Sequence, residues 1–141
     1  MERFREEVEQ LFEDLWRVPR FARPRRGFRP AVDVFRTEDP HELNVVVDLA
    51  GVDPDSVHVI LQERTLVIAG ERPRPHPSCP GSYYHLEIQY GTFERSLTFP
   101  DPVDAEGVRA TYERGLLRII LPVAARPAPG VRTAIPVRRQ T

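Results

Sequence analysis

The sequence predicts an all-β protein, an antiparallel β-sandwich, and three observations lead to that prediction. Residues 108–122 hold two stretches of alternating apolar and polar side chains on either side of a turn, which is the pattern of a β-hairpin. Residues 42–49 alternate in the same way. Further short alternating stretches follow with turn signals at nearly regular spacing, as in a sandwich whose two inner faces share one core.

The hairpin is the clearest element. Gly115 supplies the positive φ that a short turn needs, and Pro122 has no N–H for a ladder, so the second strand is expected to end there. The inward faces of its two strands are expected to hold Val108, Ala110, Tyr112, Leu117, Ile119 and Leu121.

Four more strands are expected around it. A short one covers residues 31–36, and the strand over residues 42–49 points its apolar side chains to one side. Residues 57–61 and 66–68 form two strands joined by a hairpin at residues 62–65. The alternating apolar residues of these strands are Leu43, Val45, Val47, Leu49, Val57, Val59, Leu61, Leu66 and Ile68.

A long Pro-rich loop, residues 72–82, interrupts the series, and long loops in compact domains are usually functional. Residues 83–88 are expected to form a short strand after it, and residues 92–99 the next. Arg95 falls on the apolar face of that last strand. A buried Arg requires a carboxylate or carbonyl partner.

The chain ends are predicted to be appendages of the sandwich. Residues 1–30 form an arm, residues 31–122 the sandwich, and residues 123–141 a flexible extension. Residues 2–16 of the arm read as an amphipathic helix that must bury its stripe against another chain, the β body or a client. Packing on its own domain is the plainer alternative. The stripe consists of Phe4, Val8, Leu11, Phe12, Leu15 and Trp16.

The charge is unevenly distributed. The formal net charge is −1, and all 20 basic residues are Arg. The body is acidic while the extension holds basic residues and no acidic ones, so the extension could dock on an acidic body; solubility and a general preference for Arg are the alternative. Six Arg in residues 17–30 could bind nucleic acid, but the acidic body argues against this.

The extension contains the short motif Ile135-Pro136-Val137. Pro136 favours an extended backbone and restricts Ile135 as well, so the side chains of Ile135 and Val137 should project to the same side. An apolar groove at a sandwich edge is their natural receptor. Two solvated apolar residues in a frayed tail are the alternative.

Five motifs in this order resemble the α-crystallin domain of small heat-shock proteins, in the branch found in bacteria and plants. The resemblance covers residues 30–137. The motifs are Leu49-Ala50-Gly51-Val52 with Asp55-Ser56-Val57, Leu66-Val67-Ile68-Ala69-Gly70-Glu71-Arg72, the stretch from Tyr90 to Pro100, Gly115-Leu116-Leu117 with Ile119 and Leu121-Pro122, and Ile135-Pro136-Val137.

The resemblance implies an immunoglobulin-like sandwich, a homodimer and a larger homo-oligomer. Ile135 and Val137 would be the oligomer anchor, held in a neighbour's groove lined by Val57, Val59, Leu61, Val108 and Ala110. The dimer interface would hold a strand exchanged with the partner, made of Tyr83, Tyr84, His85, Leu86, Glu87 and Ile88. Arg95, paired to an acid, would belong to the same interface. A hairpin folded on its own body is the alternative for that strand.

No catalytic, cofactor or metal constellation is found in the sequence. His76 and Cys79 provide half of a zinc spacing without a second pair, and one cysteine excludes an intrachain disulfide. No Gly-rich phosphate loop or nucleophile elbow is present. We expect no enzyme and no cofactor. We also expect a cytoplasmic protein without a membrane span, because neither a signal segment nor a long apolar run is visible.

The function implied by the resemblance is that of an ATP-independent holdase chaperone. It would bind partly unfolded clients through the stripe of residues 2–16 and through the groove when the extension lets go. A co-chaperone or scaffold of the CS-domain type, docked on one fixed partner, is the alternative, and a monomer in solution would favour it.

Overall fold

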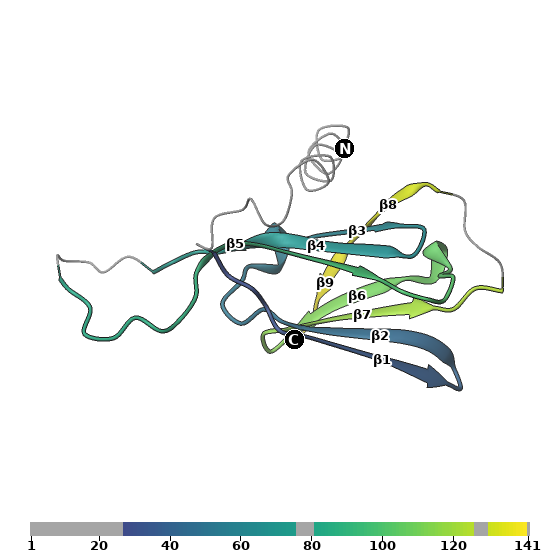
Figure 1. Ribbon diagram of the computed structural model, residues 1–141, viewed down its shortest axis with the longest axis horizontal. Coiled ribbons are helices and arrows are strands. Elements are labelled where there is room, and N and C mark those ends of the chain that lie inside the picture. The colour runs from purple at the N-terminus through teal and green to yellow at the C-terminus, as the bar shows by residue number, and fades with distance from the viewer. Residues whose placement is uncertain (1–26, 76–80, 126–129, 141) are drawn as a thin grey trace.

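Two β-sheets lie face to face in the computed structural model of the chain (Figure 1). The structure describes residues 27–75, 81–125 and 130–140. The expected helix over residues 2–16 and Cys79 lie outside these residues. The predicted sandwich is confirmed.

The first sheet has five strands in the order β1-β2-β7-β6-β9. Neighbours are antiparallel except β6 and β9, which are parallel. The strands are β1 Val32–Glu38, β2 His41–Asp48, β6 Arg109–Glu113, β7 Leu116–Pro122 and β9 Val137–Arg139.

The second sheet has four antiparallel strands in the order β5-β4-β3-β8. They are β3 His58–Gln62, β4 Thr65–Arg72, β5 Gly91–Thr98 and β8 Arg132–Ile135. Two short 3-10 turns connect strands, η2 Pro54–Ser56 and η3 Ala105–Gly107. Both follow an Asp whose side chain accepts a backbone N–H of the turn, a usual cap.

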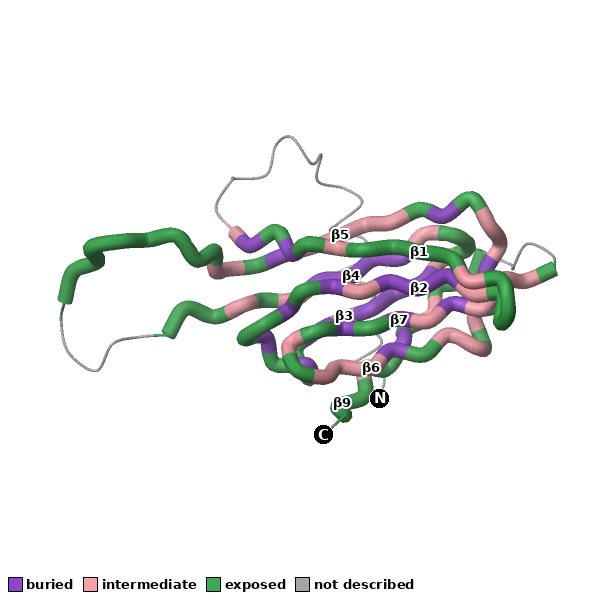
Figure 2. The backbone as a smooth tube through the Cα atoms, turned by 90° about the horizontal axis from the view of Figure 1, so that it is seen from below, coloured by how far each residue is buried: buried purple, intermediate pink, exposed green. Residues whose placement is uncertain are grey.

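The core lies between the sheets, on the alternating positions that the sequence predicts. Figure 2 shows buried residues along the central strands and an exposed β1 at the edge. Val45 and Val47 on β2 and Leu117 and Ile119 on β7 are fully buried. Period-two burial therefore sets the register of both sheets.

The β6–β7 hairpin turns as expected at Gly115, whose φ is +81°. Arg114 also has a positive φ, so both central residues are left-handed, as a type I′ turn requires. A Cβ on Gly115 would lie 3.2 Å from the Cα of Ala50, and the Gly115 carbonyl accepts the Leu49 N–H at 2.8 Å. The turn thus fits closely against the chain that leaves β2.

One expected strand is not formed within the single chain. Residues 81–90 run without a ladder partner and project from the sandwich as a loop (Figure 1). A strand exists only where another strand can exchange hydrogen bonds with it, and the loop lies beyond every sheet edge of its own chain. The alternative, a hairpin folded on the body, is not formed either.

Candidate functional site

The candidate site is the groove between β3 and β6, at the side where the two sheets would otherwise expose strand edges. The last segment of the chain fills it. Strand β8 pairs with β3 in one sheet and β9 pairs with β6 in the other, so the tail crosses from sheet to sheet (Figure 1). The linking residue is Pro136, which has no N–H to offer to either ladder.

Ile135 is the most deeply inserted residue of the tail. It lies opposite Val59 in the β3–β8 register and is only 6% exposed. It belongs to the same apolar cluster as the sandwich core. The groove therefore buries the Ile135 side chain as completely as the core of the sandwich buries its own residues.

Val137 occupies the other wall of the groove. It lies opposite Ala110 in the parallel β6–β9 register and packs, half-buried, against the core. The small side chain of Ala110 leaves room for it. One tail side chain therefore packs at the edge of each sheet: Ile135 beside β3 and Val137 beside β6.

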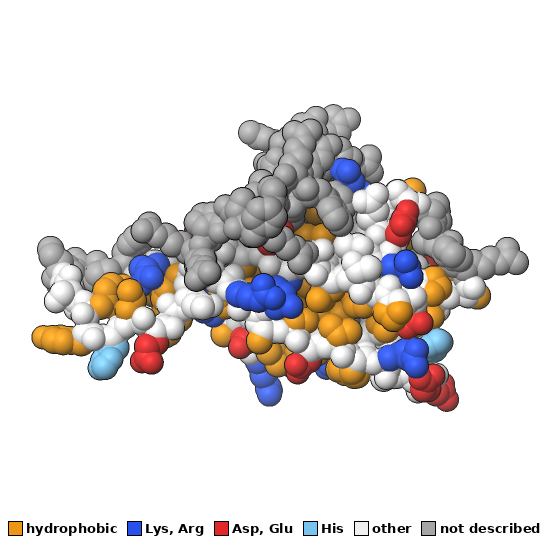
Figure 3. Space-filling view, in the orientation of Figure 1, with side chains coloured by type: hydrophobic (Ala, Val, Ile, Leu, Met, Phe, Trp, Pro, Cys, Tyr) orange, Lys and Arg blue, Asp and Glu red, His pale blue; other side chains and the backbone are white. Residues whose placement is uncertain are grey.

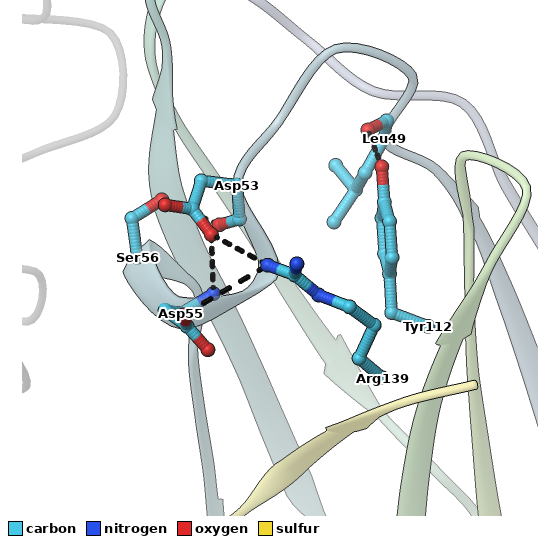
Figure 4. A network of polar contacts seen from close by, with 6 residues as sticks. All are labelled: Leu49, Asp53, Asp55, Ser56, Tyr112 and Arg139. Atoms are coloured by element: carbon cyan, nitrogen blue, oxygen red, sulfur yellow. Dashed lines mark hydrogen bonds and ion pairs between the residues drawn. The ribbon is translucent and has the colours of Figure 1, made fainter. Parts of the chain in front are cut away.

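Polar contacts fasten the end of the tail (Figure 4). The Nη2 of Arg139 lies 3.2 Å from Oδ1 of Asp53 and 3.8 Å from Oδ2 of Asp55. Both carboxylates belong to the η2 turn, and the Gln140 N–H donates to the Tyr112 carbonyl at 2.9 Å. These side chains are exposed, so the ion pairs add about 0–1 kcal/mol.

Tyr112 supports the groove from β6. Its hydroxyl donates to the Leu49 carbonyl at 3.1 Å (Figure 4). Burial raises the pKa of Tyr112, with Asp48 and Asp53 raising it further and Arg139 opposing them. The phenol therefore stays protonated, and able to donate, beyond its ordinary range.

The five predicted groove residues line this site or its core. Val59 and Ala110 face the two anchor side chains, and Leu61 lies opposite Thr133 of the tail. Val57 borders a pocket of about 140 Å³ beside Ile135, and Val108 packs against the core. The sequence did not single out Arg139 or its acidic partners, although the basic extension and acidic body pointed to such contacts.

The tail in the groove belongs to the same chain, whereas the resemblance implies a neighbour's tail. The nine residues 123–131 between β7 and β8 span at most about 30 Å, which is enough to return from the end of β7 to β3. The geometry thus defines what the groove accepts. Docking of a neighbour's tail in this groove stays a prediction.

A second candidate surface is the projecting loop, residues 81–90. Figure 3 shows hydrophobic side chains gathered on it at the left. Tyr83, Leu86 and Ile88 are among the residues that line a pocket of about 430 Å³. Tyr84 is 97% exposed, and three more large apolar side chains of the loop are open to solvent: Tyr83, Leu86 and Ile88. Such a cluster is typical of an interface.

Arg72, at the end of β4, holds the base of this loop. Its guanidinium donates from Nε and Nη2 to the Gln89 carbonyl and from Nη1 to the Ala50 carbonyl. It also lies 3.6 Å from the centre of the Phe28 ring, a cation–π contact. Arg74 lies 4.8 Å from the centre of the Tyr90 ring.

Arg95 is half-buried on β5, as its place on the apolar face predicts. Its Nη1 donates to the Pro30 carbonyl at 3.0 Å. This contact supplies a carbonyl, one of the two partner types expected, from within the chain. The predicted acid at a dimer interface stays a prediction.

Within residues 27–75, 81–125 and 130–140, no three His, Cys, Asp or Glu side chains gather as metal ligands would. No helix in this part of the chain is long and apolar enough to cross a membrane. The predicted client-binding residues 4–16, with His76 and Cys79, lie outside it.

The sequence matches a known protein family and curated relatives of moderate identity. Residues 36–138 match the Hsp20/alpha crystallin family. Spore protein SP21 of Stigmatella aurantiaca is 33% identical over 68% of this chain and 56% of its own length. Heat shock protein 16 of Schizosaccharomyces pombe is 34% identical over 66% of this chain. The match covers 65% of that relative, so less than two thirds of either relative's length is spanned.

Solved structures agree with the fold. Heat shock protein 16.0 from Schizosaccharomyces pombe superposes with a TM-score of 0.63 at 30% identity, covering 77% of this chain and 98% of the other. A small heat-shock protein from Xylella fastidiosa, described as having a distinct high order structure, superposes with a TM-score of 0.60 at 33% identity. That match covers 71% of this chain and 90% of the other.

Proposed function

Because the chain belongs to the Hsp20/alpha crystallin family of small heat-shock proteins, whose role is that of chaperones, we propose that it acts as an ATP-independent holdase. It would bind partly unfolded proteins and keep them from aggregating. The observation that carries the proposal is the tail docked in the groove. Ile135 is buried as a core residue, yet it belongs to a segment outside the hairpins of the sandwich.

Release of the tail would uncover an apolar strip. The side chains of Val59 and Ala110 face the anchor directly, and both lie at strands that become sheet edges when β8 and β9 leave. Burying the two anchor side chains is worth about 3–5 kcal/mol before entropy costs. One docked tail is therefore held reversibly. An unfolded client offers similar apolar side chains and unpaired backbone to the same strip.

The same contacts would build a homo-oligomer. A tail that enters a neighbour's groove makes the pairings seen here, and many weak contacts in one assembly act together. The exposed loop would supply the dimer contact by pairing with the edge strand of a second copy. Strand β1 is such an edge and carries the exposed apolar side chains Val34 and Phe35.

Light scattering from a heat-unfolding client, without nucleotide, tests the holdase function. We expect near-stoichiometric amounts of the full chain to suppress the scattering. Ile135→Ala with Val137→Ala should alter particle size and client capture together, and Val131→Ala is the matched control because Val131 is 63% exposed in the same tail.

Two outcomes would count against the proposal. Unchanged scattering at stoichiometric excess would contradict a holdase. A protein that sediments as a monomer and protects no client would favour the alternative, a scaffold of the CS-domain type docked on one partner. A cytoplasmic location and unfolded clients as partners belong to the same proposal, and assay of the full chain with several unrelated clients tests the breadth of its binding.

A further inference from the structure

Aromatic rings and guanidinium groups alternate from the sandwich core out along the projecting loop. At the inner end, Phe28 is buried and meets Phe93 edge to face, with ring centroids 5.6 Å apart and an interplanar angle of 81°. The Cζ atom of Arg72 lies 3.6 Å from the centroid of the Phe28 ring and 5.6 Å from that of Tyr90. The guanidinium of Arg72 therefore contacts one ring of the core and one ring of the loop.

The series continues beyond Tyr90. The Cζ atom of Arg74 lies 4.8 Å from the centroid of the Tyr90 ring and 5.6 Å from that of Tyr83. Its Nη1 also donates to the Tyr83 hydroxyl at 3.4 Å. Each of these distances lies within the range of about 6 Å over which a cation attracts an aromatic ring. We call the series Phe28, Arg72, Tyr90, Arg74 and Tyr83 the aromatic–arginine stack.

The pairing of β4 with β5 brings these side chains together. Arg72 lies opposite Gly91 in the register, so Tyr90 lies next to that pair on the returning chain. Pro73 favours an extended backbone for the outgoing chain, so Arg74 stays alongside the returning chain. One tyrosine ring can therefore contact both guanidinium groups.

Phe28 is held in place by its own segment of backbone. Its N–H donates to the Thr92 carbonyl at 3.2 Å, and the N–H of Arg29 donates to Oε1 of Gln89 at 3.3 Å. A Cβ on Gly27 would lie only 2.9 Å from the Thr92 carbonyl oxygen, so this close fit requires a glycine. The inner end of the stack therefore depends on how this segment lies against the start of β5.

We propose that the aromatic–arginine stack fixes the direction in which the loop of residues 81–90 projects, and that Phe28 is its positioning residue. Tyr83 and Tyr90 belong to the loop, whereas Phe28 belongs to the core cluster, so the stack ties the loop to the sandwich. A loop that is held in one direction loses less conformational entropy when it binds a second copy of the chain. That consequence rests on the proposed dimer contact, but the stack itself does not.

Double electron–electron resonance measures the direction of the loop. In a Cys79→Ser background, nitroxide labels are attached at Glu87→Cys in the loop and at Arg118→Cys on an exposed position of β7. Labelled chains are diluted into unlabelled ones, so that only distances within one chain are measured. We expect a single narrow distance distribution. Phe28→Leu and Tyr90→Leu should each broaden it at least twofold, because leucine is apolar but has no ring face.

Three control variants test whether the ring faces are responsible. Tyr90→Phe keeps the ring and should keep the distribution narrow. Tyr84→Leu removes a ring that is 97% exposed and outside the stack, and Phe99→Leu removes a buried ring outside the stack. Neither should broaden the distribution. Broadening in Tyr90→Phe, or broadening in the other two controls equal to that in Phe28→Leu, overturns the proposal.

A backbone variant displaces Phe28 without changing any ring. Gly27→Ala should broaden the distribution, because the added Cβ meets the Thr92 carbonyl oxygen. Gly81→Ala is the matched control in the loop, since no atom lies within 4 Å of a Cβ built there. A distribution that stays narrow in both Phe28→Leu and Gly27→Ala overturns the role of Phe28.

Sedimentation of the same variants separates this inference from the proposed dimer contact. If the loop makes that contact, the variants with broad distributions should need several-fold higher concentrations to associate. Broad distributions with unchanged association would support the stack and contradict the dimer contact. Narrow distributions in every variant of the stack overturn the inference, whatever the association.

Discussion

Ile135 shows how one side chain in a terminal segment can decide whether that segment is docked. The side chain is buried against Val59. Truncating a buried Ile to Ala costs about 2–5 kcal/mol. That is comparable with the whole free energy expected for the docked anchor. A single truncation should therefore release the tail rather than merely loosen it.

We predict that Ile135→Ala makes the tail accessible to trypsin. Cleavage after Arg132 or Arg138, followed by mass spectrometry, should be at least ten times faster than in the unmodified chain. Val131→Ala is the control, since that side chain is mostly exposed and its loss should change stability by less than about 0.5 kcal/mol. Equal cleavage of the two variants would show that the tail is held elsewhere.

Tyr112 gives the groove a dependence on alkaline pH. Because its pKa is raised in the folded chain, the stabilisation is fully present below the unfolded pKa of about 10 and is lost as pH rises through the folded value. We predict that Tyr112→Phe lowers the free energy of unfolding by about 0.5–1.5 kcal/mol at neutral pH and flattens its decline above pH ~10. Urea titrations at several pH values measure this.

The control for that prediction is Tyr84→Phe, because Tyr84 is almost fully exposed. It should leave both the neutral value and the alkaline decline unchanged. An identical decline in Tyr112→Phe and the unmodified chain would assign the alkaline loss to other groups.

At the scale of single residues, the sequence predicts which side chains are buried wherever apolar and polar residues alternate along a strand. The buried alternation of Val45, Val47, Leu117 and Ile119 follows from spacing alone. The pairing of Arg139 with Asp53 does not, because the two residues are 86 positions apart and an exposed ion pair leaves no periodic signal. Contacts of that kind become visible only when topology brings the segments together.

Among the elements, the loop of residues 81–90 and the tail show what local sequence leaves open. Aromatic and branched residues over 83–88 favour a strand, but a strand also needs an available edge, and the chain offers none there. For the tail, the sequence predicts an extended backbone with two apolar side chains, Ile135 and Val137. Its strands β8 and β9 form because two sheet edges lie at the right distance.

We predict that Arg72 controls the order of the loop. Arg72→Met keeps the aliphatic stem but removes the hydrogen bonds to the Gln89 and Ala50 carbonyls, each a charge-assisted bond worth about 1.5–3 kcal/mol. Amide hydrogen exchange over residues 84–90 should become several-fold faster, with the protection of β2 and β7 unchanged.

Arg114→Met is the matched control, because that side chain is 91% exposed at the far turn. It should leave exchange in the loop as it was. Loop exchange that is equally fast in both variants would mean that the cation–π contacts of Arg74, and not Arg72, anchor the loop. The first outcome matters for function, because a loop held at its base presents its apolar face in one direction.

For the whole molecule, charge reversal distinguishes a tail docked in its own groove, as the structure shows, from the predicted tail docked in a neighbour's groove. Arg139→Asp places like charges against Asp53 and Asp55, and Asp53→Arg places Arg against Arg139. We predict that each variant alone forms smaller assemblies at low salt than the unmodified chain. Size-exclusion chromatography with light scattering measures the assemblies.

Mixing the two variants is the decisive step. The Asp at position 139 of one chain can pair with the Arg at position 53 of another only if tails dock between chains, so the equimolar mixture should regain larger assemblies. Tails confined to their own grooves leave every contact repulsive, and the mixture would then show only the average of its two components. Arg138→Asp makes the same charge change at an exposed position with no ion pair among the described residues, and it should behave as the unmodified chain. Because each reversed pair lies on the surface, high salt should reduce all these differences together.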